Sequence, residues 1–338
     1  MALASLSALA GCDERGFGED PSLVPPPVQV LGVEVATRIG ADGLPDAYTP
    51  LDGRGSVTNA LTTSSIKVRF DRFLRPADTF RQSICVQSSL ARVTTIADCR
   101  RPVFFEPAYD PVHREIIYRQ SPDPGETHLI AGATYQVTLF PAYGEAIGGV
   151  RAFDDAPLDQ VHVYTFSTVA APEGARVDEP PRAEVFCSAV LPALRACSYA
   201  GCHLDTASAP GAAEGLELSS PERIAATAIG HVAHETQTSA HASAPTKSAP
   251  RFGTAMPLLD PSFPANSYLI YKLLASRANT RALPDAPSDA EIERLREGVV
   301  VGMPMPPTDA PGASIRDPVT LDAIVTWLFE GAPMPVCP

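Results

Sequence analysis

Hydrophobic and polar residues alternate one by one in several short segments of the first half of the chain. Ile66, Val68 and Phe70 fall on one side of such a segment, and residues 134–139 alternate in the same way. Further strand candidates cover residues 28–36, 83–88, 102–106, 114–120 and 161–168. Six or seven short strands separated by turn residues, without a convincing helix, predict a β-sandwich over residues 28–170.

In the second half of the chain the spacing of hydrophobic residues changes from two to about 3.6, which indicates α-helices. The clearest helix covers residues 317–330, where Asp317 is placed as an N-cap and Gly331 as the stop. Ser288 and Glu291 have the spacing of a capping box at the start of another helix. Helices are also predicted at residues 185–195, 267–276 and 288–298. An all-α domain is therefore expected after the sandwich.

Length and charge narrow the classes of function. The 338 residues are enough for two domains, which we place at residues 28–170 and 184–338, with a linker at residues 171–183. The net charge of −13 argues against a nucleic-acid partner, because a phosphate-binding surface needs an excess of basic residues. No run of ~18 or more apolar residues is present, so no membrane span is predicted.

The first residues predict an exported protein. They are small and apolar and lead into residues 9–12 (Leu-Ala-Gly-Cys), which resemble a bacterial lipobox, where a peptidase cuts before a cysteine that is then lipidated. We expect a signal peptide at residues 1–11, lipidation of Cys12 and a tether at residues 12–27. No Lys or Arg precedes the apolar stretch, so we expect the true start to lie upstream; the alternative is a flexible terminus with a chance cysteine.

The other cysteines divide into pairs by position. Cys85 and Cys99 lie in the β-rich half, Cys187 and Cys337 bracket the second half, and Cys197 and Cys202 lie beside His203. In an oxidising compartment, two disulfides and one site built from two cysteines account for all of them. A set of unpaired buried thiols is the alternative.

Four segments of the first half resemble bacterial Ig-like domains of the S-layer-associated type, namely residues 50–53, 66–70, 129–135 and 164–168. The resemblance implies a spacer or adhesive module without a catalytic set. It places Tyr135 where such sandwiches have a corner tyrosine. His113, His128 and His162 are interpreted as surface residues rather than ligands.

Cys197, Cys202 and His203 carry the candidate chemistry of the second half. Covalent haem attachment needs two thiols for the two vinyl groups and an imidazole directly after the second thiol, and two residues usually separate the cysteines. Here the gap is four residues, but the Cys-His dipeptide remains. Met303 and Met305 lie in a proline-rich loop before the last predicted helix. Class I cytochromes c take their second iron ligand, a methionine, from such a loop.

The second half resembles the planctomycete-type cytochrome c-like family at residues 186, 190–194, 202–203, 215–218, 267–273, 305–307 and 327–332. The resemblance implies one covalent haem c, with thioether bonds from Cys197 and Cys202. His203 would be the proximal iron ligand and Met305 the distal one, with Met303 as its rival. A His/Met pair is associated with a raised reduction potential, which suits electron transfer rather than oxygen chemistry.

The same resemblance assigns three further residues. Trp327 would pack in the last helix near the haem. The first and last helices of cytochromes c pack together, so Cys187 in the first helix and Cys337 just beyond the last are expected to form a disulfide. By closing a loop of about 150 residues, this bond would contribute ~4–5 kcal/mol in the chain-entropy model.

Together these features predict a lipid-anchored, mono-haem c-type cytochrome of the cell envelope that works in extracytoplasmic electron transfer. It would need a redox partner protein, contact the membrane through its lipid anchor only and catalyse no reaction of its own. An acidic surface would suit a cationic partner.

Several alternatives stay open. In a haem-free structural or adhesive lipoprotein, Cys197 and Cys202 would form a disulfide. A second alternative is a zinc site formed by Cys197, Cys202 and His203, although a fourth ligand at finger-like spacing is missing. A haem enzyme such as a peroxidase would need a distal acid–base residue, and none stands out. His231 and His234 have the i, i+3 spacing of one helix face, which would allow them to bind a metal or a second haem. The composition of the flanking residues instead favours a solvated surface.

Overall fold

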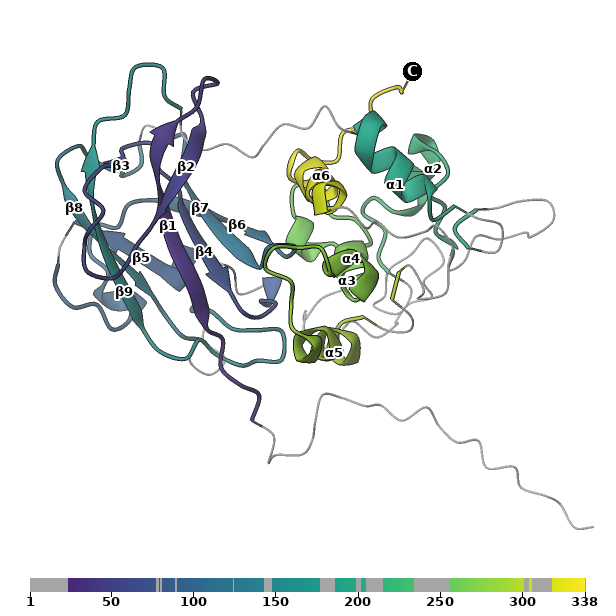
Figure 1. The fold of residues 1–338 in the computed structure, drawn as a ribbon, viewed down its shortest axis with the longest axis horizontal. Helices are drawn as coiled ribbons and strands as arrows, with labels where there is room; N and C mark the ends of the chain where they lie inside the picture. Colours follow the sequence, from purple (N-terminus) through teal and green to yellow (C-terminus); the bar gives the residue numbers. More distant parts are fainter. Residues whose placement is uncertain are drawn as a thin grey trace, which may run out of the picture.

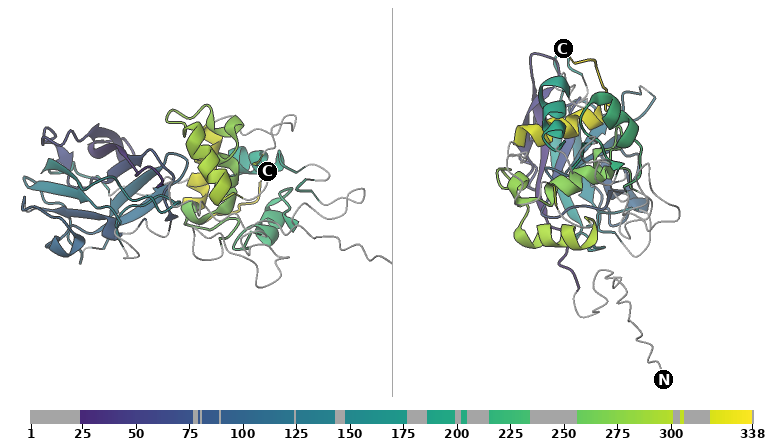
Figure 2. Two further views of the ribbon diagram at one scale, coloured as in Figure 1. Left: turned by 90° about the horizontal axis from the view of Figure 1, so that it is seen from below. Right: turned by 90° about the vertical axis from the view of Figure 1, so that its right-hand side faces the viewer.

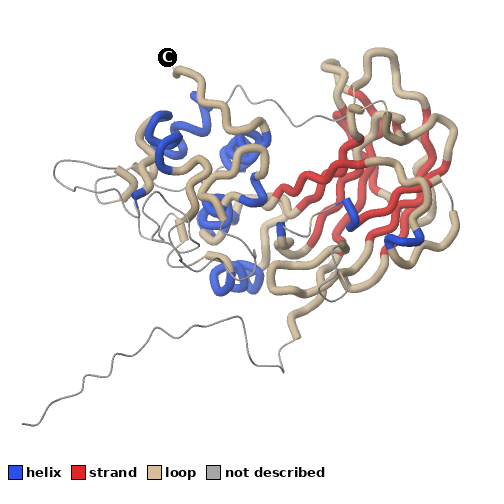
Figure 3. Tube along the Cα trace, turned by 180° about the vertical axis from the view of Figure 1, so that it is seen from behind, coloured by secondary structure: helices blue, strands red, loops and turns tan. Residues whose placement is uncertain are grey.

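The chain forms a β-sheet region followed by a region with several helices in the computed structural model (Figure 1). The structure describes residues 24–76, 79, 81–88, 90–123, 125–142, 148–176, 186–198, 202–204, 215–233, 256–300, 304–305 and 318–337. Strands gather in one half of the molecule and most helices in the other (Figure 3). The predicted order of a β region followed by a helical region is therefore confirmed.

Two sheets make up the β region. The five-stranded sheet has the order β2-β1-β4-β7-β6, and the four-stranded sheet has the order β3-β9-β8-β5. The strands are β1 (Val30–Ile39), β2 (Pro45–Pro50), β3 (Ala60–Leu61), β4 (Ile66–Phe70), β5 (Ile84–Gln87), β6 (Phe105–Asp110), β7 (Glu115–Gln120), β8 (Thr134–Leu139) and β9 (His162–Val169). Paired strands run antiparallel, apart from β3 and β9, which are parallel.

The alternating pattern predicted seven of the described strands and missed β2 and β3. Ile66 and Val68 of β4 are fully buried, because alternate side chains of a strand point to the same face. β2 was missed because Pro45 and Pro50 bound it, and proline is tolerated in an edge strand, the place that β2 occupies. The strand predicted at residues 102–106 begins three residues later, as β6.

A tyrosine and a disulfide fix two loops of the β region. The Tyr135 ring stacks on Phe166 with 5.7 Å between ring centroids, and its hydroxyl accepts a hydrogen bond from the Ile130 N–H at 2.8 Å. A tyrosine that binds the backbone a few residues upstream is the arrangement expected of a corner tyrosine. Cys85 and Cys99 form a disulfide with 5.9 Å between their Cα atoms, which confirms the predicted pair.

Six α-helices follow in the described part of the second half. They are α1 (Leu191–Arg195), α2 (Pro221–Thr227), α3 (Tyr268–Leu274), α4 (Arg277–Thr280), α5 (Asp289–Gly298) and α6 (Pro318–Phe329), and a π-helical turn (Phe186–Val190) precedes α1. The helices predicted at residues 267–276, 288–298 and 317–330 are confirmed as α3, α5 and α6. The helix predicted at residues 185–195 is confirmed in part, because its first half is the π-helical turn, and α2 and α4 are additional. The Ser220 hydroxyl caps α2 by accepting from the Arg223 N–H, so the Ser-Pro pair at its start was a usable signal.

The last helix packs against the first helical segment. Leu321, Ile324 and Leu328 of α6 are fully buried, as the predicted apolar stripe requires. α6 contacts the π-helical turn that carries Cys187. Cys187 and Cys337 form a disulfide with 5.4 Å between their Cα atoms, so this predicted bridge is also confirmed.

Hydrophobic side chains of the two regions interlock. Phe73 and Phe153 of the β region belong to the hydrophobic core of the helical region, and Ala265 packs into the core of the β region. The Phe73 ring meets Tyr271 of α3 edge-on, with 6.3 Å between ring centroids. Figure 2 shows the helices standing directly against one end of the β region. The two regions therefore share an interface and are not joined by the linker alone.

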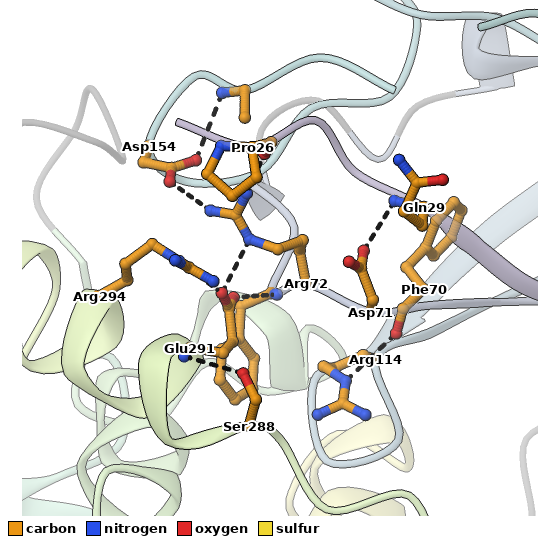
Figure 4. A network of polar contacts seen from close by, with 12 residues as sticks. Pro26, Gln29, Phe70, Asp71, Arg72, Arg114, Asp154, Ser288, Glu291 and Arg294 are labelled. Atoms are coloured by element: carbon orange, nitrogen blue, oxygen red, sulfur yellow. Dashed lines mark hydrogen bonds and ion pairs between the residues drawn. The ribbon is translucent and has the colours of Figure 1, made fainter. Parts of the chain in front are cut away.

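A buried ion-pair network crosses this interface (Figure 4). Arg72 Nε donates to the Glu291 carboxylate of α5 at 2.8 Å. The other guanidinium nitrogens bond Asp154 and the Pro26 carbonyl. The Phe73 N–H donates to the second Glu291 oxygen at 2.7 Å. Arg72 and Glu291 are both buried, so each depends on the other to offset its loss of hydration.

The capping box predicted for α5 is half present. The Ser288 hydroxyl accepts from the Glu291 N–H at 3.2 Å, so the start of the helix was predicted correctly. In a complete box the Glu291 carboxylate would reach back to the Ser288 N–H. It binds Arg72 and the Phe73 N–H instead, because a buried guanidinium is the stronger partner.

Each of the three histidines of the β region has a hydrogen-bond partner, and two of these partners are local. His128 Nε2 lies 2.9 Å from the Asp123 carbonyl oxygen, and His162 Nε2 lies 2.6 Å from Asp159 Oδ1. His113 was interpreted as a plain surface residue, but its Nε2 lies 2.8 Å from Asp322 Oδ1 in α6. His113 thus adds a further polar link between the two regions, beside those of Arg69 and Arg114 to Asp285.

Some expectations fall on residues that the structure does not describe. Cys12, the predicted signal peptide, most of the tether and residues 177–183 of the linker all lie outside the described ranges. Within those ranges, no helix combines the length and hydropathy that crossing a bilayer requires.

Candidate functional site

The two candidate cysteines follow the first helix of the second half. The Cys197 N–H donates to the Leu194 carbonyl of α1 at 3.0 Å, so Cys197 lies directly after that helix. Its side chain is half-buried against the core of the helical region, whereas Cys202 is exposed. Both side chains are free thiols. The structure therefore does not contain the Cys197–Cys202 disulfide of the haem-free alternative.

The electrostatics of Cys197 are those of an inert thiol. Burial raises its pKa to about 11, and the nearby Cys202 adds to the rise. Cys197 is therefore protonated at neutral pH. Catalytic cysteine pairs have lowered pKa values, at helix N-termini or beside cations, whereas Cys197 follows the C-terminus of α1, where the helix dipole is negative. The Cys197 thiol therefore does not have the lowered pKa of a catalytic cysteine.

A backbone hydrogen bond closes the four-residue gap between the cysteines. The His203 N–H donates to the Cys197 carbonyl at 3.3 Å, which returns the chain to the end of α1 despite the long spacing. The Leu218 N–H donates to the His203 carbonyl at 3.1 Å and ties the loop to the next segment. The Ser198 hydroxyl in this loop is buried and, within the described part of the chain, has no hydrogen-bond partner.

The His203 side chain is buried and oriented by the backbone. Its Nδ1 lies 3.2 Å from the Leu216 carbonyl oxygen. A carbonyl only accepts hydrogen bonds, so this contact places the ring proton on Nδ1 and the lone pair on Nε2. Histidines that bind metals characteristically donate their other ring N–H to such a carbonyl. The Leu216 carbonyl therefore fixes the tautomer and the orientation of the His203 ring.

Met305 is attached by its backbone to the region of α3 and α4. Its N–H donates to the Lys272 carbonyl at 3.1 Å, and its carbonyl accepts from Asn279 Nδ2 at 3.0 Å. Its side chain is partly buried against the same hydrophobic core that holds Cys197. Met303, its rival in the sequence, lies outside the described residues.

Trp327 lies inside the core of the helical region. Its ring is fully buried and lies 5.4 Å from the Phe186 ring, measured between centroids. Its Nε1 donates to the Pro333 carbonyl at 2.8 Å. Trp327 therefore joins the π-helical turn, α6 and the C-terminal segment, close to the Cys187–Cys337 disulfide.

The histidine pair predicted on one helix face is not supported. The backbone around His231 is not helical, because Val232 forms a β-bridge with Pro257 and the His231 carbonyl accepts from the Leu258 N–H at 2.6 Å. His234 lies outside the described residues. An i, i+3 spacing is meaningful only on a helix, so the argument for a shared ligand face fails.

The described residues offer no cluster for a zinc ion. No group of three or more His, Cys, Asp and Glu side chains among them is arranged to hold a metal, so Cys197, Cys202 and His203 do not form one. A cleft of about 500 Å³, which the sequence did not reveal, lies in the β region between β5 and β6. Its walls include Ile84, Phe105 and the Cys99 end of the disulfide, so it is separate from the cysteine–histidine motif.

Comparison of the chain with protein-family models, curated proteins and solved structures finds no match.

Proposed function

We propose that this chain is a lipid-anchored, mono-haem c-type cytochrome of the cell envelope that exchanges electrons with a redox partner protein. Residues 28–170 form an Ig-like spacer, and residues 184–338 form the cytochrome c-like domain. The observation that carries the proposal is the setting of His203: a buried imidazole directly after an exposed free thiol, with Nδ1 facing the Leu216 carbonyl.

The chain offers the ligand types that a haem of the c type requires. Cys197 and Cys202 would form the two thioether bonds, and His203 and Met305 would ligate the iron. When bound, this group supplies a one-electron redox centre. The unsatisfied hydroxyl of Ser198 also fits a cofactor site, because a buried polar atom without a partner calls for a missing group or water.

The chain's own residues supply position and insulation. The Leu216 carbonyl keeps the His203 proton on Nδ1 and fixes the plane of the ring. The Lys272 carbonyl and the Asn279 amide hold the backbone of Met305. The hydrophobic core next to Cys197 and Met305 excludes water, which keeps the local dielectric constant low.

The fold and the cysteines support the rest of the proposal. Two facing sheets and the hydrogen bond of Tyr135 favour the Ig-like assignment. Packing of the first and last helical segments and the Cys187–Cys337 disulfide favour the cytochrome c-like assignment. Two disulfides favour an extracytoplasmic location. Lipidation of Cys12 rests on the sequence pattern alone.

The decisive experiment is a pyridine haemochrome spectrum of the protein expressed with cytochrome c maturation factors, after extraction with acidified acetone. We expect haem to stay with the polypeptide and to give the reduced α-band of a thioether-bound haem. Cys202→Ala should lose one thioether bond, which shifts that band. A colourless polypeptide would overturn the proposal and favour the structural or adhesive lipoprotein.

Ligand variants separate the assigned residues from their neighbours. His203→Ala should abolish stable haem incorporation, whereas His231→Ala should leave it unchanged. Met305→Ala should remove the sulfur-to-iron absorption band of the ferric protein, and Met334→Ala should retain it, because Met334 packs on the same core without the backbone anchors of Met305. Equal effects within either pair would contradict the assignment.

A further inference from the structure

Asn279 is a buried asparagine that joins two segments of the helical region. It lies in α4 and is fully buried. Its Nδ2 donates to the Leu273 carbonyl at 2.8 Å and to the Met305 carbonyl at 3.0 Å. Leu273 lies in the last turn of α3, and its carbonyl also accepts from the Ser276 N–H at 3.1 Å. A single amide therefore links the backbone at the end of α3 to the backbone of Met305.

Met305 is held from both sides of its backbone. Its N–H donates to the Lys272 carbonyl and its C=O accepts from Asn279, with distances of 3.1 and 3.0 Å. Rotating the backbone at Met305 would break at least one of these bonds. They therefore restrict the direction in which the thioether side chain leaves the chain.

The other end of the Asn279 amide has no structural use in the described part of the chain. Asn279 Oδ1 is buried and has no hydrogen-bond partner there. An apolar residue of similar size would avoid the cost of an unsatisfied buried acceptor. The two N–H donors must therefore be the reason for an amide at this position.

We propose that Asn279 is a positioning residue, which acts by holding Met305 so that its sulfur faces the haem iron. The inference rests on the proposed haem site. A thioether ligand that is fixed in its bound geometry loses little conformational freedom when it binds, so removing the constraint weakens the bond. His203 and the two thioether bonds lie on other segments and are independent of Asn279.

Two substitutions test this role in the full chain, matured with its haem. Asn279→Asp keeps the size but replaces the donors with acceptors, and Asn279→Leu removes hydrogen bonding without adding charge. In both variants we expect the sulfur-to-iron band to weaken or disappear. Added imidazole should bind the ferric protein about tenfold more tightly, which corresponds to about 1.4 kcal/mol. Haem content and the pyridine haemochrome should match those of the unmodified protein.

Thr280→Val is the matched control. Thr280 is buried in the same helix and contacts the Ser276 carbonyl, away from Met305. This variant should keep both the sulfur band and the imidazole affinity. If the two Asn279 variants do not fold, Asn279→Ser keeps one donor and should give an intermediate imidazole affinity.

The outcomes distinguish this inference from the proposed function. Asn279 variants with covalent haem, an unchanged sulfur band and unchanged imidazole affinity would overturn the positioning role and leave the cytochrome proposal intact. An unmodified protein without covalent haem would overturn both. A loss of haem in the Asn279 variants alone would also contradict the inference, since attachment is assigned to Cys197 and Cys202.

Discussion

In Glu291→Ala, the Arg72 guanidinium keeps Asp154 but loses the carboxylate that comes from the helical region. The Glu291 side chain accepts from Arg72 Nε at 2.8 Å, from Arg294 Nε at 2.9 Å and from the Phe73 N–H at 2.7 Å. Without it, an arginine that is only 2% exposed has one carboxylate partner, and a buried N–H has no acceptor. The contacts with Arg72 and Phe73 cross the interface between the two regions, whereas the contact with Arg294 lies within α5.

The size of the effect follows from burial. Removing one partner of a buried ion pair costs about 3–5 kcal/mol, and a buried N–H without an acceptor costs about 1–3 kcal/mol. Both losses come from one carboxylate, so they overlap. We therefore expect Glu291→Ala to lower the free energy of unfolding by about 4–6 kcal/mol. A domain is stable by about 5–15 kcal/mol, so the loss is large enough to separate the two regions.

Denaturation by guanidinium, with the disulfides intact, measures this loss with two probes. Trp327 is the only tryptophan of the chain and is buried in α6, so its fluorescence reports the helical region. Far-UV circular dichroism includes the β region. The probes should coincide in the unmodified protein. In Glu291→Ala the guanidinium concentration at the fluorescence midpoint should fall by about 1 M, if the free energy of unfolding decreases by about 4 kcal/mol per M of denaturant.

Glu293→Ala is the matched control on the same helix. Glu293 is 52% exposed and pairs with Arg296 at 3.1 Å, so its removal should cost less than about 0.5 kcal/mol. If Glu291→Ala unfolds within about 1 kcal/mol of the unmodified protein, or with coincident probes, the argument for a buried interface pair is wrong.

Three further predictions concern single contacts. The hydrogen bond to Asp322 raises the His113 pKa from 6.5 to about 9. The pair therefore stabilises the folded state fully below pH 6.5, and this stabilisation is lost as the pH rises through about 9. Asp322→Asn should flatten the resulting fall in the thermal unfolding midpoint between these two pH values. Tyr135→Phe should cost about 1 kcal/mol in chemical denaturation, by removing one hydrogen bond, and a neutral result would contradict the corner role. Non-reducing peptide mass spectrometry should find Cys187 linked to Cys337, and replacing both by Ala should lower the free energy of unfolding by about 4–5 kcal/mol.

The parts of the fold that could be predicted from the sequence are those whose pattern is local and long. β4 and α6 each repeat one hydrophobic period, and burial enforces that period along the whole element. α2 is only two turns long, so its period does not emerge from seven residues. β2 carries proline at both ends, which its edge position allows but its sequence conceals.

The candidate site divides in the same way. Cys197, Cys202 and His203 are adjacent in the sequence, so their spacing exposes the motif. Asn279 lies 26 positions before Met305, and no local pattern links a helix asparagine to a distant loop carbonyl. Glu291 was even assigned to a local partner, because a single sequence does not show a pair with an arginine 219 positions away.

Arg72 joins three segments that the sequence suggests to be functionally distinct. It binds the Pro26 carbonyl at the end of the predicted tether, Asp154 of the β region and Glu291 of the helical region. A guanidinium presents five donors in a rigid fork, so it can fix three acceptors at once, whereas a lysine could satisfy the same charges without fixing their directions. Arg72→Lys should therefore preserve the net charge and still loosen the interface. Under the proposed function, the helical region and the β region would therefore meet a redox partner as one body.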